Sequence, residues 1–531
     1  MQALYARIWT HVRQNLSSYI VIALGAVIQL LLITRSFDFI LTNLLPDDAF
    51  YYFQIARQIV EGNGSTFDGT EPTNGYHPLW LVVLLPFFSV FSVGGTFDVT
   101  PIYAVLGVSF LINIATALIV LRLVAKLTVN HLARTIAMIV WALNPFILFE
   151  SLNGLETSLA LFFLALFSLT ALHAVAHNQT RDYVIVGVVA GLMVLARLDM
   201  ALYAVAFAVW LLFHCGLKEG MTRAFQTGAV ALLVASPWFI WNFNTFGMLL
   251  TSASNGNVII NHALVVQDNG ASLFQSIKAV FYMLVYHGTA VLERTGMSWF
   301  IFALLGASAA LLASGERALS LHRKEFPLLL ALFGGCVALF LINAGIRFTG
   351  RTWYFVSVHL FIVLTSAWIL GYFFEHTVRP RLLAVFLIIV LSGSFFLGWY
   401  QEIRDQHALQ RKMYEMAEYM NERLPVGTRV GVFNAGVQGY FSQVEVVNLD
   451  GLVNNSAYEA IRDRRLWSYI QEKDIAYISD FDLYLSYRYK PFLDTPDIYT
   501  HLKEAHRIVF GVDRRGNDSI TLYQVVSLEV R

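Results

Sequence analysis

The sequence predicts a polytopic α-helical membrane protein that ends in a small α/β domain. The first observation is the composition. The 531 residues are 57% hydrophobic and only 14% charged, with a mean hydropathy of +0.59, values typical of membrane proteins rather than soluble ones. The second is a series of apolar runs of membrane-spanning length. The third is a change to a soluble composition after Tyr400, where strand-like and helix-like patterns alternate.

The N-terminal segment predicts a retained signal anchor. Residues 1–18 carry Arg7 and Arg13, and the apolar run over 19–33 that follows lacks a small-residue cleavage site. We therefore expect the N-terminus to be cytoplasmic.

About thirteen apolar runs are long enough, or nearly long enough, to cross a bilayer. Two of them, 79–97 and 276–292, are interrupted by proline, glycine or charged residues, and we expect these to be juxtamembrane or re-entrant helices. About eleven spans then remain. The runs are 19–37, 79–97, 101–121, 134–149, 157–176, 183–197, 199–215, 225–243, 276–292, 298–314, 326–344, 354–373 and 382–400.

This assignment places the basic residues of the short loops on the cytoplasmic face, as the positive-inside rule requires. The same parity places the unusual polar motifs and the C-terminal domain on the outer face of a plasma (inner) membrane. The basic groups are Arg7 with Arg13, Arg122 with Lys126 and Arg134, Arg181, Lys218 with Arg223, Arg317 with Arg323 and Lys324, and Arg379 with Arg381.

The chain divides into a transmembrane part, 1–400, whose first outer loop is 38–78, and an extracytoplasmic α/β domain, 401–531. In the second part the patterns predict strands over 429–433, 444–448 and 475–478 and a helix over 458–473. Gly431, Gly436 and Gly439 have the wrong spacing for a nucleotide-binding turn, and a structural turn is favoured.

Charge and cysteine content exclude several classes of protein. The 36 basic and 36 acidic residues balance, so no nucleic-acid partner is indicated. Cys215 and Cys336 lie in apolar segments without ligand-like neighbours. They are interpreted as packing residues, neither paired in a disulfide nor bound to a metal.

Two adjacent acids, Asp47 and Asp48, follow the first apolar run. Ionised groups beside hydrocarbon are costly unless they are paired, solvated or used in chemistry. One carboxylate suits a general base toward an acceptor hydroxyl, and its neighbour can position a cation or the acceptor. The alternative is an N-cap for the aromatic helical run that follows, and both functions are compatible.

Polar and aromatic residues crowd the rest of the first outer loop. Asn74, Tyr76 and His77 precede Trp80 in the way expected of a sugar or phosphate site. Tyr52 is a candidate for the same site, although tyrosines at a membrane surface are also common as interface anchors.

A second outward acid, Glu156, follows Asn153 at the start of an apolar run. A carboxylate is favourable at a helix N-terminus in any case, but paired carboxylates at one membrane boundary also suit catalysis. Arg197 and Asp199 form either a structural ion pair or part of the substrate site.

Arg351, with Tyr354 three residues later, is a better candidate for a phosphate ligand than Arg197. A guanidinium grips two phosphate oxygens at once. The alternative is an interfacial arginine that extends its charge toward water.

Together these motifs resemble the GT-C superfamily of membrane glycosyltransferases. The resemblance rests on the acid pair after the first span, Tyr76-His77-Pro78 at the end of the first outer loop, Asn153-Gly154-Leu155-Glu156 after the third span, and the outer C-terminal domain. The likeness is greatest to protein O-mannosyltransferases and to the bacterial lipid A aminoarabinose and core-sugar transferases. It covers about the first 370 residues.

The resemblance implies a polyprenyl-phosphate-linked monosaccharide as donor and a single displacement with inversion at the anomeric carbon. It implies that Asp47 is the general base, with Asp48 as its acidic partner. Glu156 corresponds to the second acid, and Arg351 meets the lipid phosphate. O-mannosyltransferases have Asp-Glu and a double proline, whereas this chain has Asp-Asp and only Pro78, so glycan, lipid and protein acceptors all stay open.

Cofactor and class stay open at this point. A divalent ion held by Asp48 and Glu156 could replace Arg351 as the stabiliser of a phosphate leaving group. A membrane transporter or lipid flippase is an alternative, although no charged groups near mid-bilayer and no repeated halves are evident. A non-catalytic envelope assembly protein is another.

Overall fold

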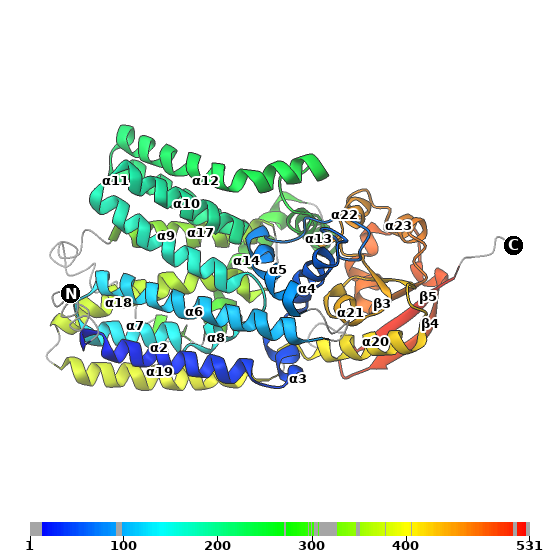
Figure 1. Ribbon diagram of the computed structural model, residues 1–531, viewed down its shortest axis with the longest axis horizontal. Helices are drawn as coiled ribbons and strands as arrows, with labels where there is room; N and C mark the ends of the chain where they lie inside the picture. Colours follow the sequence, from blue (N-terminus) through cyan, green and yellow to red (C-terminus); the bar gives the residue numbers. More distant parts are fainter. Residues whose placement is uncertain are drawn as a thin grey trace.

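A computed structural model places a helical part and a C-terminal sheet domain side by side along the longest axis of the molecule (Figure 1). It describes residues 13–91, 98–269, 272–295, 297–298, 300–301, 306, 326–346, 351–376, 379–404, 406–512 and 518–526.

The helical part consists largely of long α-helices that run nearly parallel to that axis (Figure 1). Its helices are α2 (Leu16–Ile33), α3 (Phe37–Phe39), α4 (Asp47–Val60), α5 (Pro78–Phe91), α6 (Thr100–Leu127), α7 (His131–Ala142), α8 (Pro145–Glu150), α9 (Thr157–His177), α10 (Thr180–Ala196), α11 (Ala201–His214), α12 (Leu217–Phe246), α13 (Ser252–Asn269), α14 (Leu273–Arg294), α17 (Phe326–Gly345), α18 (Val356–His376) and α19 (Pro380–Glu402).

Seven helices in the described part of the chain are long and apolar enough to cross a membrane. They are Leu16–Ile33, Thr100–Leu127, Thr157–His177, Leu217–Phe246, Leu328–Gly345, Thr352–His376 and Pro380–Glu402, and Pro78–Phe91, His131–Ala142 and Leu198–His214 are shorter apolar helices. The predicted run 298–314 lies mostly outside the described residues. The total of about eleven spans therefore stays a prediction.

Apolar side chains cover the outside of this bundle. The helices α2, α12 and α19 expose leucine, isoleucine and phenylalanine side chains, for example Leu31, Phe225 and Phe396. Large apolar surfaces of this kind are unfavourable in water and suit lipid. Inside the bundle α10 packs closely on α12, because Gly191 leaves room where a Cβ would lie 2.6 Å from that of Val234.

The C-terminal domain contains a five-stranded sheet in the order β2-β1-β3-β5-β4. The strands β2, β1 and β3 are parallel, and β5 pairs antiparallel with both β3 and β4. The elements are α20 (Leu409–Arg423), β1 (Arg429–Val432), α21 (Ala435–Phe441), β2 (Glu445–Asn448), α22 (Asn455–Arg462), α23 (Leu466–Glu472), β3 (Tyr477–Phe481), β4 (Leu502–Val509) and β5 (Ser519–Val525).

The sequence located β1, β2 and β3, but two predictions in this domain were wrong. The helix expected over 458–473 is two helices, because Arg464 adopts a positive φ of 54° between α22 and α23. Gly436 and Gly439 do not form a turn. They lie in α21 and allow it to contact α4 and the ring of Phe67, since a Cβ on either would overlap these neighbours.

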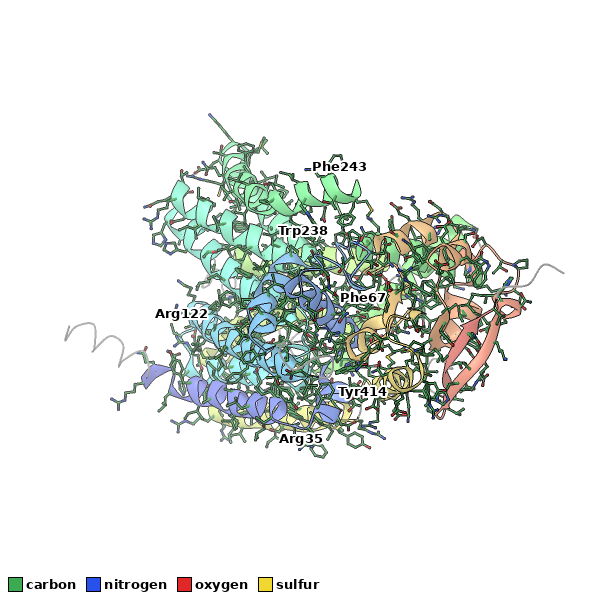
Figure 2. All side chains as sticks on the ribbon, turned by 45° about the vertical axis from the view of Figure 1, so that its right-hand side comes forward. Arg35, Phe67, Arg122, Trp238, Phe243 and Tyr414 are labelled. Carbon is green, nitrogen blue, oxygen red and sulfur yellow. The ribbon has the colours of Figure 1, made fainter. Side chains whose placement is uncertain are left out.

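The two parts meet at the first outer loop. Helix α21 packs against α4, and Figure 2 shows Phe67 at this junction and Arg122 near the opposite end of the bundle. The guanidinium of Arg57 donates to the backbone oxygen of Tyr440 at 2.8 Å and lies over its ring. The C-terminal domain is therefore anchored on the loop that carries the predicted site.

Candidate functional site

The acid pair, Asp47 and Asp48, occupies the first turn of α4. The N-cap position of α4 is Pro46, so the alternative function considered for the acid pair, an N-cap of this helix, is not observed. Instead the Asp47 carboxylate accepts hydrogen bonds from the backbone N–H groups of Val437 at 2.7 Å and Gly436 at 3.1 Å. It caps α21, a helix of the C-terminal domain.

The surroundings of Asp47 change its acidity. Burial raises the pKa of Asp47 to about 7, against the hydrogen bond from Val437, and the neighbouring Asp48 adds to the rise. A carboxylate with a pKa near neutral is suited to accept and release a proton under physiological conditions.

Asp48 lies within electrostatic range of Arg351. Burial lowers the pKa of Arg351, but Asp48 and Tyr484 outweigh it and keep the pKa above its ordinary value. None of the described residues donates a hydrogen bond to the Asp48 carboxylate. Asp48 therefore acts on Arg351 through its charge at more than 4.0 Å, without a direct ion pair.

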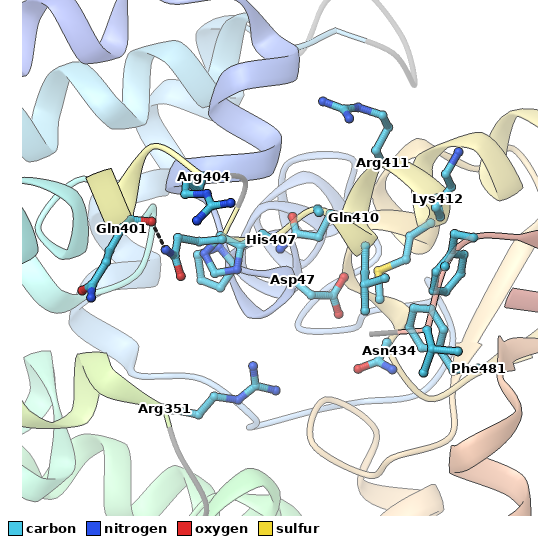
Figure 3. Close-up of a pocket in the computed structure, with 18 of the residues that line it drawn as sticks. Asp47, Arg351, Gln401, Arg404, His407, Gln410, Arg411, Lys412, Asn434 and Phe481 are labelled. Carbon is cyan, nitrogen blue, oxygen red and sulfur yellow. Dashed lines mark hydrogen bonds between the residues drawn. The ribbon is translucent and has the colours of Figure 1, made fainter. Parts of the chain in front are cut away.

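A cavity of about 930 Å³ lies between the helical part and the C-terminal domain. Asp47 and Arg351 both line it, together with Arg404 and His407 (Figure 3). We call it the basic cavity because Arg294, Arg351, Arg404, Arg411 and Lys412 outnumber Asp47 and Glu293 among its lining residues. It suits an anionic ligand.

The cations of the basic cavity differ in their partners. Arg411 is paired with Asp38 at 2.7 Å and Lys412 with Glu415 at 2.7 Å. Within the described residues Arg351 and Arg404 have no carboxylate within 4.0 Å. Arg351 lies over the ring of Trp353 at 5.4 Å, and Arg404 over that of Tyr400 at 4.8 Å. These two guanidinium groups keep donors for a phosphate.

Glu156 is the centre of a second constellation, which we call the Glu156 cluster. The Tyr52 hydroxyl donates to its Oε2 at 2.9 Å. His77 Nε2 lies 3.6 Å and Arg197 Nε 3.8 Å from its Oε1. The cluster consists of Glu156, Tyr52, His77, Arg197, Asp199 and Tyr354.

The remaining members of the cluster surround Arg197, which is 3% exposed. Its guanidinium pairs with Asp199 at 3.0 Å, donates to the backbone oxygen of Trp353 at 2.8 Å and lies over the ring of Tyr354 at 4.7 Å. Burial lowers the pKa of His77, although Glu156 opposes this. His77 is therefore an uncharged hydrogen-bonding group at neutral pH.

A turn before α9 places Glu156. Gly154 has a φ of +72°, which favours glycine, and its carbonyl accepts from Trp80 Nε1 at 3.0 Å. Asn153, predicted as a substrate ligand, is occupied within this turn: its oxygen accepts from the Leu155 N–H, and its amide donates to Glu150 and Thr157.

Asn74 and Tyr76, also predicted as substrate ligands, lie outside the cluster. Asn74 is fully buried and bonds to Asn242, to the Ser252 N–H and to Asn455. It joins the first outer loop to α12, α13 and the C-terminal domain. The Tyr76 hydroxyl bonds to Ser65, and its ring packs on Trp238.

Two acids of the C-terminal domain lie near Asp47 and Tyr51. The sequence left the function of the segment 448–452, which contains Asp450, open, and it gave no role to Asp480. Asp450 accepts from the Tyr51 hydroxyl at 3.0 Å, and burial raises the pKa of Asp450 to about 7. Asp480 accepts from the backbone N–H groups of Phe433 and Asn434 at 2.8 Å each. The one available signal was position, because both acids follow or end parallel strands, where the ends of neighbouring strands meet.

Asp48 and Glu156, the predicted ligands of a divalent ion, differ in how well their surroundings suit a metal. Glu156 already faces Arg197 and His77, so a divalent ion there would displace or repel a buried guanidinium. Within the described residues the one group of three ligands close together lies elsewhere, at the far end of α9. A role for Asp48 with a metal stays a prediction.

Two family models match parts of the chain. Residues 84–241 match the family described as dolichyl-phosphate-mannose-protein mannosyltransferase, and residues 401–523 match one described as a domain of unknown function (DUF8728). Among curated proteins, none matches the sequence.

Solved structures of similar fold cover nearly the whole chain. ArnT from Cupriavidus metallidurans bound to undecaprenyl phosphate is 13% identical, with a TM-score of 0.58 over 94% of this chain and 97% of that one. A second similar structure is that of the oligosaccharyltransferase AglB from Archaeoglobus fulgidus, in complex with an inhibitory peptide and a dolichol-phosphate. It is 15% identical, with a TM-score of 0.55, and the match covers 97% of this chain and 75% of that one. The Archaeoglobus fulgidus oligosaccharyltransferase tethered to an acceptor peptide is 14% identical, with a TM-score of 0.56. The match covers 96% of this chain and 75% of that one.

These comparisons confirm the resemblance predicted from the sequence. ArnT and AglB are GT-C glycosyltransferases, and the chain is a multi-pass membrane protein with a GT-C-like fold and a small C-terminal sheet domain.

Proposed function

We propose that the chain is a membrane glycosyltransferase that transfers a monosaccharide from a polyprenyl-phosphate donor to an acceptor on the extracytoplasmic side. The observation that carries the proposal is the junction of the basic cavity with the Glu156 cluster. Helix α4 supplies Asp47 to the cavity and Tyr52 to the cluster. The segment 351–354 supplies Arg351 to the cavity and Tyr354 to the cluster.

The basic cavity suits the donor phosphate. Arg351 and Arg404 can each direct two N–H groups at phosphate oxygens and can stabilise the charge that develops as the phosphate leaves. The similar structures of ArnT and AglB contain undecaprenyl phosphate and dolichol-phosphate, which supports a lipid phosphate as the ligand.

The acid pair suits activation of the acceptor. Asp47, with a pKa of about 7, takes the proton of the acceptor hydroxyl as its oxygen forms the new bond to the anomeric carbon. The bond from that carbon to the phosphate oxygen breaks, and the polyprenyl phosphate leaves with the electron pair. A single displacement of this kind inverts the anomeric centre.

The Glu156 cluster suits the sugar. Glu156 and Asp199 are acceptors, Arg197 is a donor, and Tyr354 offers an aromatic face, which is the mixture that sugar hydroxyls and ring C–H groups need. In this scheme Asp48 holds Arg351 in position, and no step passes through a metal ion. We also propose that 1–400 carries the chemistry and that 401–531 completes its outer wall.

A transfer assay tests the proposal against a transporter, a flippase or a non-catalytic assembly protein. Membranes with the wild type, Asp47→Asn or Glu156→Gln receive radiolabelled polyprenyl-phosphate sugars. Asp463→Asn is the matched control, since that acid is exposed and lies at the end of α22. We expect both site variants to lose product about 100-fold or more and the control to keep it. Equal product from all four would refute the assignment.

A further inference from the structure

A cluster of metal-ligating side chains lies at the end of α9 that is farthest from the proposed active site. It consists of His173 and His177, near the C-terminal end of α9, and Asp182, in the first turn of α10. Glu156 and His177 flank the same 21-residue helix, so the two sites are about 30 Å apart. We call these three residues the His–His–Asp cluster.

We propose that the His–His–Asp cluster binds a divalent transition-metal ion of the Zn²⁺ type. One ligand atom of each residue lies within 4.8 Å of the other two, and His173 Nε2 is 3.8 Å from the Asp182 carboxylate. Zinc binds imidazole nitrogens and carboxylate oxygens at about 2.0–2.2 Å. Small changes of side-chain rotamer are enough to bring the ligands to that distance.

The geometry of α9 places the imidazoles of His173 and His177 together, where both can bind one metal ion. The two histidines are four residues apart, which places them on one face of α9, and their ring centroids are 4.0 Å apart. His177 Nδ1 is 2.9 Å from the backbone oxygen of His173. Donation of the Nδ1 proton to that carbonyl leaves the Nε2 lone pair for a metal, the arrangement that orients histidine ligands in metal sites.

The carboxylate and the space around it complete the site. Asp182 is only 9% exposed, and its contact with His173 is the one ion pair it makes among the described residues. A cavity of about 550 Å³ lined by all three residues leaves room for water in the remaining coordination positions. A bound ion would join the end of α9 to the start of α10 across Asn178, which has a positive φ of 53°.

Two cations oppose the ion. Lys126 and Arg181 line the same cavity, and their charges repel a divalent metal. Removal of either charge should therefore tighten metal binding. A simple ion pair between His173 and Asp182 predicts no change when Arg181 is replaced, since it provides no metal affinity that Arg181 could weaken.

The test uses the purified full-length chain in lipid nanodiscs, with an affinity tag that contains no histidine. Zn²⁺ is titrated against a chromogenic chelator, and Co²⁺ absorption in the visible range reports on the coordination geometry. We expect one site in the wild type that weakens about tenfold or more in His177→Ala and in Asp182→Asn. Arg181→Gln should bind Zn²⁺ more tightly.

His214→Ala is the matched control. This histidine also ends an apolar helix, but its ring stacks on Trp210 at 4.4 Å and it has no ligand-like partner in the cluster. It should leave Zn²⁺ affinity unchanged. Thermal unfolding without metal checks that each variant is folded. If His177→Ala or Asp182→Asn does not fold, His173→Gln takes its place. Equal Zn²⁺ affinity in the wild type and the two ligand variants would overturn the proposal, which is independent of glycosyl transfer.

Discussion

Glu156 and Asp47 are both acids at the end of the helical part that faces the C-terminal domain, but different parts of the chain hold them. Glu156 is held by side chains from the first 200 or so residues, chiefly Tyr52 and Arg197. Asp47 is held by backbone N–H groups of Gly436 and Val437, nearly 400 positions later. The comparison indicates that the helical part holds Glu156 by itself, whereas the contacts of Asp47 form only when the C-terminal domain is docked.

The largest expected effect comes from Arg197→Ala, which breaks the Glu156 side. The substitution leaves Glu156 and Asp199 as buried acids without their cation, at a cost of about 3–5 kcal/mol of stability. Thermal unfolding in detergent measures it. The exposed Arg181→Ala is the control and should stay within about 0.5 kcal/mol of the wild type. A similar loss in both variants would contradict the assigned geometry.

Gly436→Ala breaks the Asp47 side without removal of any charge. A Cβ there would overlap the backbone oxygen of Asp47, so α21 must move away from α4 at a cost of about 1–3 kcal/mol. We expect faster hydrogen exchange over 435–441 and a loss of transfer activity, while the Glu156 cluster stays protected. Gly511→Ala is the control, since nothing lies within 4 Å of its Cβ position. Unchanged exchange over α21 would refute the docking argument.

Tyr51→Phe sharpens the comparison at the same junction. It removes the hydroxyl that donates to Asp450 and to the Phe433 carbonyl, and a buried acceptor left without its donor costs about 1–3 kcal/mol. Part of this cost disappears at low pH, because Asp450 is then protonated. Tyr419→Phe is the control and is expected to have no effect, because the ring still stacks on His506 and the Tyr419 hydroxyl makes no hydrogen bond among the described residues. Equal stability of the two variants at pH 8 would contradict a structural role for Tyr51.

The smallest effect is a shift in the pH dependence of transfer. A general base works only when ionised, and the pKa of Asp47 is about 7, so activity should rise between about pH 6 and 8. Asp480 contributes a repulsion that raises the pKa of Asp47. Asp480→Asn should therefore move the acidic limb of the profile of kcat/KM to lower pH by a few tenths of a unit. A shift to higher pH would exclude Asp47 as the group that titrates.

Several site residues could be predicted from the sequence because charged groups beside apolar segments have a high desolvation cost unless they are paired or used in chemistry. Glu156, Arg197 and Asp199 are charged residues at the ends of apolar runs, and the structure brings them together with Tyr52, His77 and Tyr354. The same reasoning selected Asn74, Tyr76 and Asn153, which the structure instead uses to join segments and shape a turn. A polar residue near a site looks the same in sequence whether it binds a ligand or its own backbone.

The sequence by itself determined the membrane class, the soluble C-terminal domain and the acid pair, because hydropathy and charge are local properties of a segment. Only the tertiary structure decided that Asp47 caps α21, that Asp450 meets Tyr51, and that Arg351 shares a cavity with Asp47. These contacts join residues 300 to 400 positions apart, which is more than the length of a typical domain. No local pattern encodes them, since they depend on how the sheet domain docks on the first outer loop.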